Sequence, residues 1–255
     1  MTKKLLSKQI FKQSIKGNWI LWLSLTGVLS FFITVMTLMG SKMLENQSQG
    51  GFGGGTSSLL SLYANGIFGM LGIMILIIFA IVVGNKLVAS EVDKGTMSYT
   101  LNTPITRKQI VFSKGLFYIL SIALMGITVG LFGTASIAIA GADVALDTFW
   151  TLILGFVLYG FAIGGICFFA SCWFNKSGSS IALGAGLSIA FFMFNSLASI
   201  SGLEWLKYFT LNTLYDTSAI ISGSGYIIQM IALFVIGAVL YILGCNKFIK
   251  KDLPL

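Results

Sequence analysis

The sequence contains no histidine, only two prolines and three cysteines, and few charged residues. Without an imidazole, the chain cannot form Ser-His dyads or triads, HExxH zinc sites or histidine-ligated haem sites. Charged residues make up 9% of the chain, whereas soluble domains usually contain about 25%. This is too little polar surface for a soluble fold of 255 residues. The composition therefore indicates a membrane protein.

Motifs for nucleotide and metal chemistry are missing as well. No Gly-x-x-x-x-Gly-Lys-[Ser/Thr] sequence occurs, so the chain has no phosphate-binding loop for ATP. The three cysteines, Cys167, Cys172 and Cys245, lack the spacing of a metal site and are expected to pack as small apolar side chains. We therefore predict no catalytic site, no metal site and no cofactor bound by this chain itself.

Apolar residues make up 56% of the sequence and gather in six long stretches without a charged residue. A bilayer core about 30 Å thick needs roughly 20 apolar residues in a helix. The stretches that meet this requirement are Trp19–Gly40, Tyr63–Asn85, Gly115–Ala140, Phe149–Trp173, Ser180–Ile200 and Gly225–Cys245. The gaps between them are short, so residues 1–255 are expected to form one all-α integral membrane domain with six transmembrane helices.

The charged residues between these stretches predict the orientation of the chain. If the N-terminus is cytoplasmic, 14 of the 16 basic residues but only three of the eight acidic residues lie on the cytoplasmic side. Loops rich in lysine and arginine remain in the cytoplasm. We therefore expect a multi-pass membrane protein with both termini in the cytoplasm. The excess of positive charge is then a feature of topology, and no nucleic-acid partner is expected.

Two segments outside the spans have distinct patterns. Within residues 1–18, lysines recur every four residues from Lys4 to Lys16, which predicts a cytoplasmic interfacial helix on the anionic inner leaflet. Alternatively, these lysines only set the topology. Residues 201–224, on the extracellular side before the last span, are too apolar for a solvated loop, so we expect them either to enter the outer leaflet or to pack on the bundle as short helices.

The longest cytoplasmic loop, residues 86–114, carries the clearest local signals. Gly95 is expected to end the helix of the second span, and Pro104 breaks any helix that precedes it. Thr106 and Gln109 have the spacing of a capping box, which predicts the start of a helix that runs into the third span. The short block between Gly95 and Pro104 is therefore held between two helix boundaries.

In the same loop the sequence resembles a known family. The chain reads EVDKGTM at 91–97, then PITR at 104–107, and then Lys114. With six spans and cytoplasmic termini, this order resembles the type-2 ABC transporter permeases. In that family an acidic residue near the end of the second helix is followed by Gly-Thr, a proline-containing turn, an arginine and a later lysine.

The resemblance implies a coupling helix near Thr96–Thr103 that docks on a separate cytoplasmic ATP-binding cassette ATPase, which would bind ATP and Mg²⁺. The residues expected at this contact are Glu91, Asp93, Gly95, Thr96, Met97, Tyr99, Pro104 and Arg107. Without the resemblance, the three charged members of this set are more typical of a solvated helix end. The resemblance also implies that residues 201–224 form short re-entrant helices and that the protein lies in a bacterial plasma membrane. It further implies that a second permease copy or a homologue pairs with this chain within the membrane lipid.

The uncharged spans favour a hydrophobic or amphipathic cargo. The chain is similar to the permeases of phenol-soluble-modulin exporters, which implies export of amphipathic peptides or drugs and resistance to antimicrobial peptides. The candidate residues of the substrate path are Phe191, Phe192, Phe194 and Asn195. The phenylalanines are equally typical of helix packing or lipid contact, and the asparagine of a hydrogen bond between helices.

Two other functions stay open at this point. One is a non-transporting membrane anchor, scaffold or regulatory subunit for a cytoplasmic partner. The other is a secondary carrier, which is disfavoured because such carriers usually keep ionisable residues inside their spans.

Overall fold

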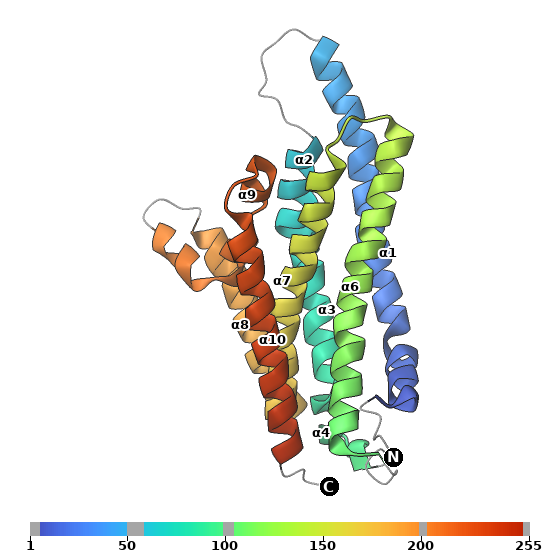
Figure 1. Cartoon of the computed structure of the whole chain (residues 1–255), viewed down its shortest axis with the longest axis vertical. Helices are drawn as coiled ribbons and strands as arrows, with labels where there is room; N and C mark the ends of the chain where they lie inside the picture. The colour runs from blue at the N-terminus through green and yellow to red at the C-terminus, as the bar shows by residue number, and fades with distance from the viewer. Residues whose placement is uncertain (1–5, 50–58, 99–104, 199–202, 252–255) are drawn as a thin grey trace.

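The computed structural model describes residues 6–49, 59–98, 105–198 and 203–251. Over these residues the protein is an α-helical bundle, and they contain no strand (Figure 1). Six helices are long and apolar enough to cross a membrane, and each overlaps one of the predicted spans. The prediction of an all-α membrane protein with six transmembrane helices is therefore confirmed.

The long helices follow one another along the chain with short connections. They are α1 (Lys8–Gln49), α3 (Gly72–Leu87), α6 (Arg107–Ala140), α7 (Leu146–Trp173), α8 (Ser177–Leu197) and α10 (Tyr226–Lys250). The second span also includes α2 (Leu59–Leu62) and the π-helix η1 (Tyr63–Leu71), which run directly into α3. The remaining short helices are α4 (Ala89–Asp93), η2 (Glu204–Phe209), η3 (Leu211–Leu214) and α9 (Thr217–Ser222).

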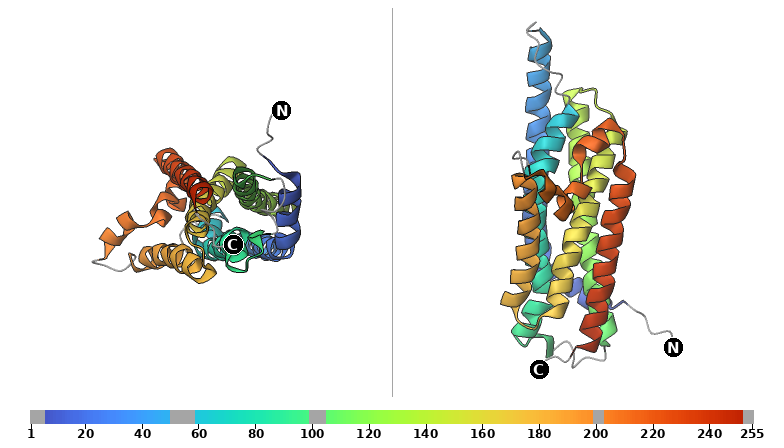
Figure 2. Two further views of the ribbon diagram at one scale, coloured as in Figure 1. Left: turned by 90° about the horizontal axis from the view of Figure 1, so that it is seen from below. Right: turned by 90° about the vertical axis from the view of Figure 1, so that its left-hand side faces the viewer.

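Helix α7 forms the centre of the bundle and contacts α3, α6, α8 and α10 (Figures 1 and 2). In its most apolar stretch 72% of the residues are buried inside the protein, compared with 17% for α8, which lies at the edge. Glycines permit this central position. A Cβ atom at Gly160 or at Gly164 would lie 2.9 Å from the side chain of Ile122, so α6 and α7 approach closely only because both side chains are absent.

The first turns of α1 lie across one end of the bundle, whereas the rest of the helix runs along the bundle axis (Figures 1 and 2). Ile10 and Asn18 are buried against the bundle. Lys8, Lys12 and Lys16 are exposed, so the basic stripe faces away from the protein. This geometry fits the interfacial helix that the lysine spacing predicts, although the structure joins it to the first span without a break.

The start of α1 and the end of α10 lie at the same end of the bundle (Figure 1). We call it the basic end, because the lysines of α1 and the last turn of α10 lie there. Between α8 and α10, the described residues from 203 onwards form η2, η3 and α9 instead of an extended loop. The prediction of short helices before the last span is therefore confirmed in its secondary structure.

Candidate functional site

The connection between the second and third spans begins with a break in the helix. Helix α3 ends at Leu87, and Val88 has φ −129° and ψ −65°, outside the helical region. The chain becomes helical again in α4, where the backbone N–H of Ala89 donates a hydrogen bond to the buried Ser171 Oγ of α7 at 2.8 Å. A side chain of a neighbouring span thus satisfies a donor that the break releases.

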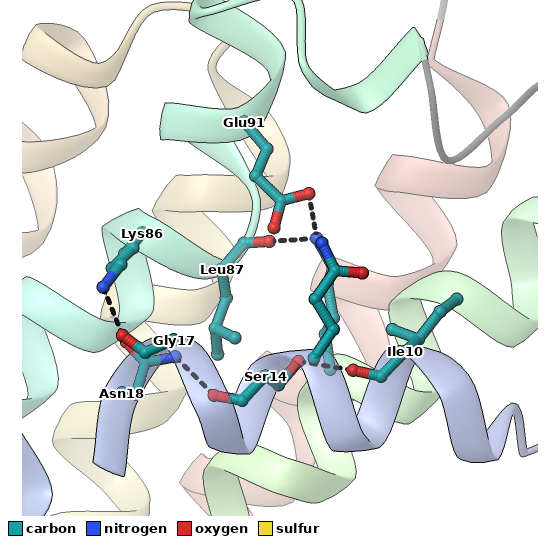
Figure 3. A pocket seen from close by; sticks show the side chains of 9 residues that line it. Ile10, Ser14, Gly17, Asn18, Lys86, Leu87 and Glu91 are labelled. Atoms are coloured by element: carbon teal, nitrogen blue, oxygen red, sulfur yellow. Dashed lines mark hydrogen bonds and ion pairs between the residues drawn. The ribbon is translucent and has the colours of Figure 1, made fainter. Parts of the chain in front are cut away.

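A buried ion pair fixes this break to the third span. Lys114 of α6 has only 3% of its side chain exposed, and its Nζ lies 2.5 Å from Glu91 Oε2 (Figure 3). The same Nζ donates to the backbone oxygen of Leu87 at 2.6 Å. A buried ammonium requires such partners because it has lost its hydration. Since Leu87 precedes Val88 and Glu91 follows it, one lysine holds both sides of the break.

A second set of contacts joins the connection to α8. Asp93 Oδ2 accepts a hydrogen bond from the backbone N–H of Ser177 at 3.1 Å, and Asn85 Nδ2 donates to Ser177 Oγ at 2.7 Å. Ser177 is the first residue of α8, and the N–H groups of a first turn have no partner within their own helix. Asp93 therefore caps α8 from another element, and its negative charge is favourable at that helix terminus.

Beyond this base the chain forms an exposed tip. Gly95 has φ +70°, a left-handed conformation that favours glycine, and it follows the end of α4. Lys94 and Thr96 are exposed, whereas Met97 is fully buried. Thr96 Oγ1 donates to the backbone oxygen of Glu91 at 3.2 Å, which folds the tip back on α4. The sequence predicts that Gly95 ends the helix of the second span, but α3 already ends at Leu87 because of the break at Val88, and Gly95 ends the short helix α4 instead.

Helix α6 starts with the predicted capping box. The backbone N–H of Gln109 donates to Thr106 Oγ1 at 3.4 Å, and the backbone N–H of Thr106 donates to Gln109 Oε1 at 2.9 Å. In the next position, Arg107 Nη1 donates to the backbone oxygen of Lys251 at 2.8 Å. Arg107 is therefore bound to the end of α10.

The end of α10 also carries a perturbed amine. Lys251 Nζ donates to the backbone oxygen of Cys172 at 3.2 Å. Burial, together with the smaller effect of the nearby charge of Lys247, lowers the pKa of Lys251 from 10.5 to about 8. Together with Arg107, these contacts join the last turns of α7 and α10 to the start of α6.

The structure brings most of the predicted coupling residues together in one short segment. These are Glu91, Asp93, Gly95, Thr96 and Met97. Tyr99 and Pro104 lie outside the described residues, as does most of the predicted coupling helix Thr96–Thr103. Sequence reasoning treated Lys114 only as a cytoplasmic charge and motif residue, and it missed Ser171 and Ser177 as partners. The position of Lys114, directly before an uncharged stretch, was the one available signal for its burial.

A cavity of about 200 Å³ lies beside the ion pair, between the first turns of α1 and the end of α3 (Figure 3). Lys86 Nζ donates to the backbone oxygen of Gly17, which links the two walls. Ser14 Oγ and Asn18 Nδ2 bond backbone oxygens of α1 itself. Lys86, Glu91 and Lys114 line this cavity. Since the first turns of α1 form its other wall, they pack beside the ion pair of Glu91 and Lys114.

The candidate path residues lie on α8. Phe191 and Phe192 pack against the hydrophobic core, and Phe194 is 38% exposed. Asn195 instead lines a second cavity of about 330 Å³, together with residues of η1, α3, η3 and α9. Within the described ranges, no group of three or more aspartate, glutamate, cysteine or histidine residues could hold a metal ion.

The sequence matches the model of a known protein family. A family model described as "ABC-2 family transporter protein" matches residues 6–253. The match covers nearly the whole chain, including all six spans and the connection between the second and the third. A search of curated proteins finds no match to the chain.

Proposed function

Because the chain belongs to the ABC-2 family of transporter proteins, and is thus a membrane component of an ABC exporter, we propose that it is a permease subunit that docks on a separate cytoplasmic ATPase. In this proposal the protein lies in a bacterial plasma membrane with its basic end in the cytoplasm. The ATPase subunit binds ATP and Mg²⁺, and this chain supplies the transmembrane path. The distribution of lysine and arginine supports this orientation.

The observation that carries the docking proposal is an exposed tip on an anchored base. Lys94 and Thr96 are exposed at the basic end, while the residues just before them are held by Lys114 and Ser177. A tip of this kind offers a partner a surface of fixed shape. Fixed geometry also limits the entropy that is lost when the partner binds.

The same contacts give the tip a route to the spans. A partner that moves α4 also moves the end of α3, since Lys114 holds Leu87 and Glu91 together. Through Lys114 and Ser177 the displacement reaches α6 and α8. Closure of the ATPase around ATP would in this way shift the balance between two arrangements of the helices.

We further propose that two permease chains, identical or homologous, form the path for hydrophobic or amphipathic peptides or drugs. The six predicted spans contain no charged residue, which supports a cargo with a large apolar surface. Membrane lipid contacts the many apolar side chains exposed on the outside of the bundle.

Docking is tested by co-purification of the membrane protein with its ATPase. The double variant K94E/T96E adds negative charge to the exposed tip, and K12E makes a comparable change on exposed α1. We expect K94E/T96E to lower the amount of bound ATPase at least about tenfold, which corresponds to roughly 1.4 kcal/mol, and K12E to leave it unchanged. Equal retention of the ATPase by both variants would contradict docking at the tip.

Export is tested in two further measurements. The purified chain alone should hydrolyse no ATP, and hydrolysis should appear only with the ATPase subunit. Cells that lack the chain should accumulate a fluorescent amphipathic peptide and become more sensitive to it. Unchanged accumulation and sensitivity would contradict a peptide cargo. ATP hydrolysis by the lone chain would contradict the assignment of the ATPase activity to a separate subunit.

A further inference from the structure

The cavity that contains Asn195 lies in the half of the bundle away from the basic end, and we call it the outer cavity. Its walls come from η1 and α3 of the second span, from α8, and from η3 and α9. The cavity therefore lies at the level of the spans, where the chain between α8 and α10 is broken into short helices. Irregular backbone at this depth occurs where it is buried in protein or lines a water-filled cavity.

One wall of the outer cavity has an unusual backbone. Gly69 lies on η1, a π-helix of nine residues, and π-helical turns inside helices are frequent at functional sites. A Cβ atom at Gly69 would lie 2.6 Å from the backbone oxygen of Ala64. The π-helical turn at this position therefore requires a residue without a side chain.

A buried amide forms part of the wall of the outer cavity. Asn212 is 5% exposed, and its Oδ1 accepts a hydrogen bond from Tyr159 Oη at 2.7 Å. Its Nδ2 is buried and has no hydrogen-bond partner. Exchanging the oxygen and the nitrogen of this amide would still leave one of them unpaired. With less than 1 Å² of accessible surface, Nδ2 itself does not face the cavity, so the part played by Asn212 in this wall is to hold Tyr159.

The charge of the outer cavity is negative. Among the described residues that line it, Asp216 is the only charged one. Asp216 caps α9: its Oδ1 accepts hydrogen bonds from the backbone N–H groups of Ser218 and Ala219 and from Ser218 Oγ. All of these bonds use Oδ1, which leaves Oδ2 for a further donor. Phe68 and Ile73 supply an apolar wall beside these polar groups.

We propose that the outer cavity binds a primary ammonium group of the exported peptide, a lysine side chain or the amino terminus. Oδ2 of Asp216 pairs with the ammonium, and the apolar wall of Phe68 and Ile73 contacts the methylene chain. The assignment rests on the proposed function and adds a preference for cationic amphipathic cargo. Export moves a cationic cargo against an inside-negative membrane potential. A carboxylate in the outer half of the bundle therefore stabilises the ammonium where its electrical energy is highest.

The test uses the complete complex in phosphatidylcholine nanodiscs and two probes. One is a lysine-rich amphipathic helical peptide, and the other is the same peptide with its amino groups acetylated. D216N removes the charge but retains the helix cap, because asparagine caps helices as well as aspartate. D143N is the matched control, since Asp143 is exposed in the loop that precedes α7. A photo-crosslinking residue at Thr213, which lines the cavity, reports where the peptide binds.

D216N should weaken binding of the lysine peptide roughly fivefold, as expected for the loss of a partly exposed ion pair. It should leave binding of the acetylated peptide unchanged, and D143N should match the wild type with both probes. Equal affinity of D216N and the wild type for the lysine peptide would overturn the proposal. A further measurement uses nanodiscs that contain phosphatidylethanolamine as well as the peptide. Crosslinking of position 213 to this lipid instead of the peptide would also overturn the proposal and assign the cavity to a lipid headgroup.

Failure of the site and failure of the proposed function give different results. ATP-dependent uptake of the lysine peptide by inverted vesicles measures export directly. Absence of uptake with the wild-type complex contradicts the proposed function. Uptake and binding that D216N leaves unchanged contradict the outer cavity alone.

Discussion

Replacing Glu91 by alanine should destabilise the protein more than replacing its partner Lys114 by methionine. The substitution leaves the ammonium of Lys114, which is 3% exposed, with only the backbone oxygen of Leu87 among its described partners. Removal of one member of a buried ion pair typically reduces the free energy of unfolding by 3–5 kcal/mol. Since the side chain of Glu91 is itself 28% exposed, water can reach the site, and we expect the lower end of that range, about 3 kcal/mol.

The reverse change, Lys114→Met, should have a smaller effect. Methionine fills a similar volume, and the remaining carboxylate of Glu91 is exposed enough to be hydrated. The substitution leaves the backbone oxygen of Leu87 without its donor, which should lower stability by about 1–2 kcal/mol. The double variant E91A/K114M buries no charge and should also lose about 1–2 kcal/mol, well below the roughly 4–5 kcal/mol of an additive pair.

The free energy of unfolding is measured in detergent micelles by denaturant titration, with the fluorescence of the five tryptophans as the signal. D143A, which removes an exposed carboxylate from a loop, controls for the loss of any negative charge. A double variant as unstable as the sum of the single variants would refute the coupling between Glu91 and Lys114. So would an E91A variant as stable as D143A.

Three further predictions concern other local features. T106A removes the capping box and should lower the free energy of unfolding by about 1 kcal/mol in the same titration, and no change would show that the cap is dispensable. G126A places a Cβ atom 2.2 Å from a methyl group of Val157 and should lower the free energy of unfolding by about 1–3 kcal/mol. G186A, which has open space around it, should not lower it. Equal effects of the two substitutions would contradict close packing of α6 and α7. The pKa of Lys251 is lowered from 10.5 to about 8 in the folded protein, so the wild type should gain stability relative to K251M as the pH rises from about 8 to 10.5. A constant difference in the free energy of unfolding between the two proteins across this range would contradict the burial of the amine.

The sequence predicts those parts of the fold that depend on neighbours along the chain. The six spans follow from uninterrupted apolar stretches, and the start of α6 follows from the spacing of Thr106 and Gln109. Gly95 adopts the positive φ that its role as a helix terminator requires. Each of these features is set by residues within one helix or one turn, so a local pattern is sufficient.

Features that depend on contacts between spans are not visible in the sequence. Lys114 is buried only because α4 turns at Val88 and brings Glu91 against α6. The unpaired amide of Asn212 likewise depends on where η3 lies relative to α7. The path residues Phe191, Phe192 and Phe194 remain predictions, since they would contact cargo only in the complete assembly.

The contacts of α4 also have a mechanical consequence. Its five residues are joined to α6 through Lys114, to α7 through Ser171 and to α8 through Asp93. These three contacts join the short helix α4 to three different neighbours and act mechanically in parallel, so their stiffnesses add. In the proposed docking, a force on α4 would be divided among these three helices. Loss of any single contact would then weaken the proposed transmission without interrupting it.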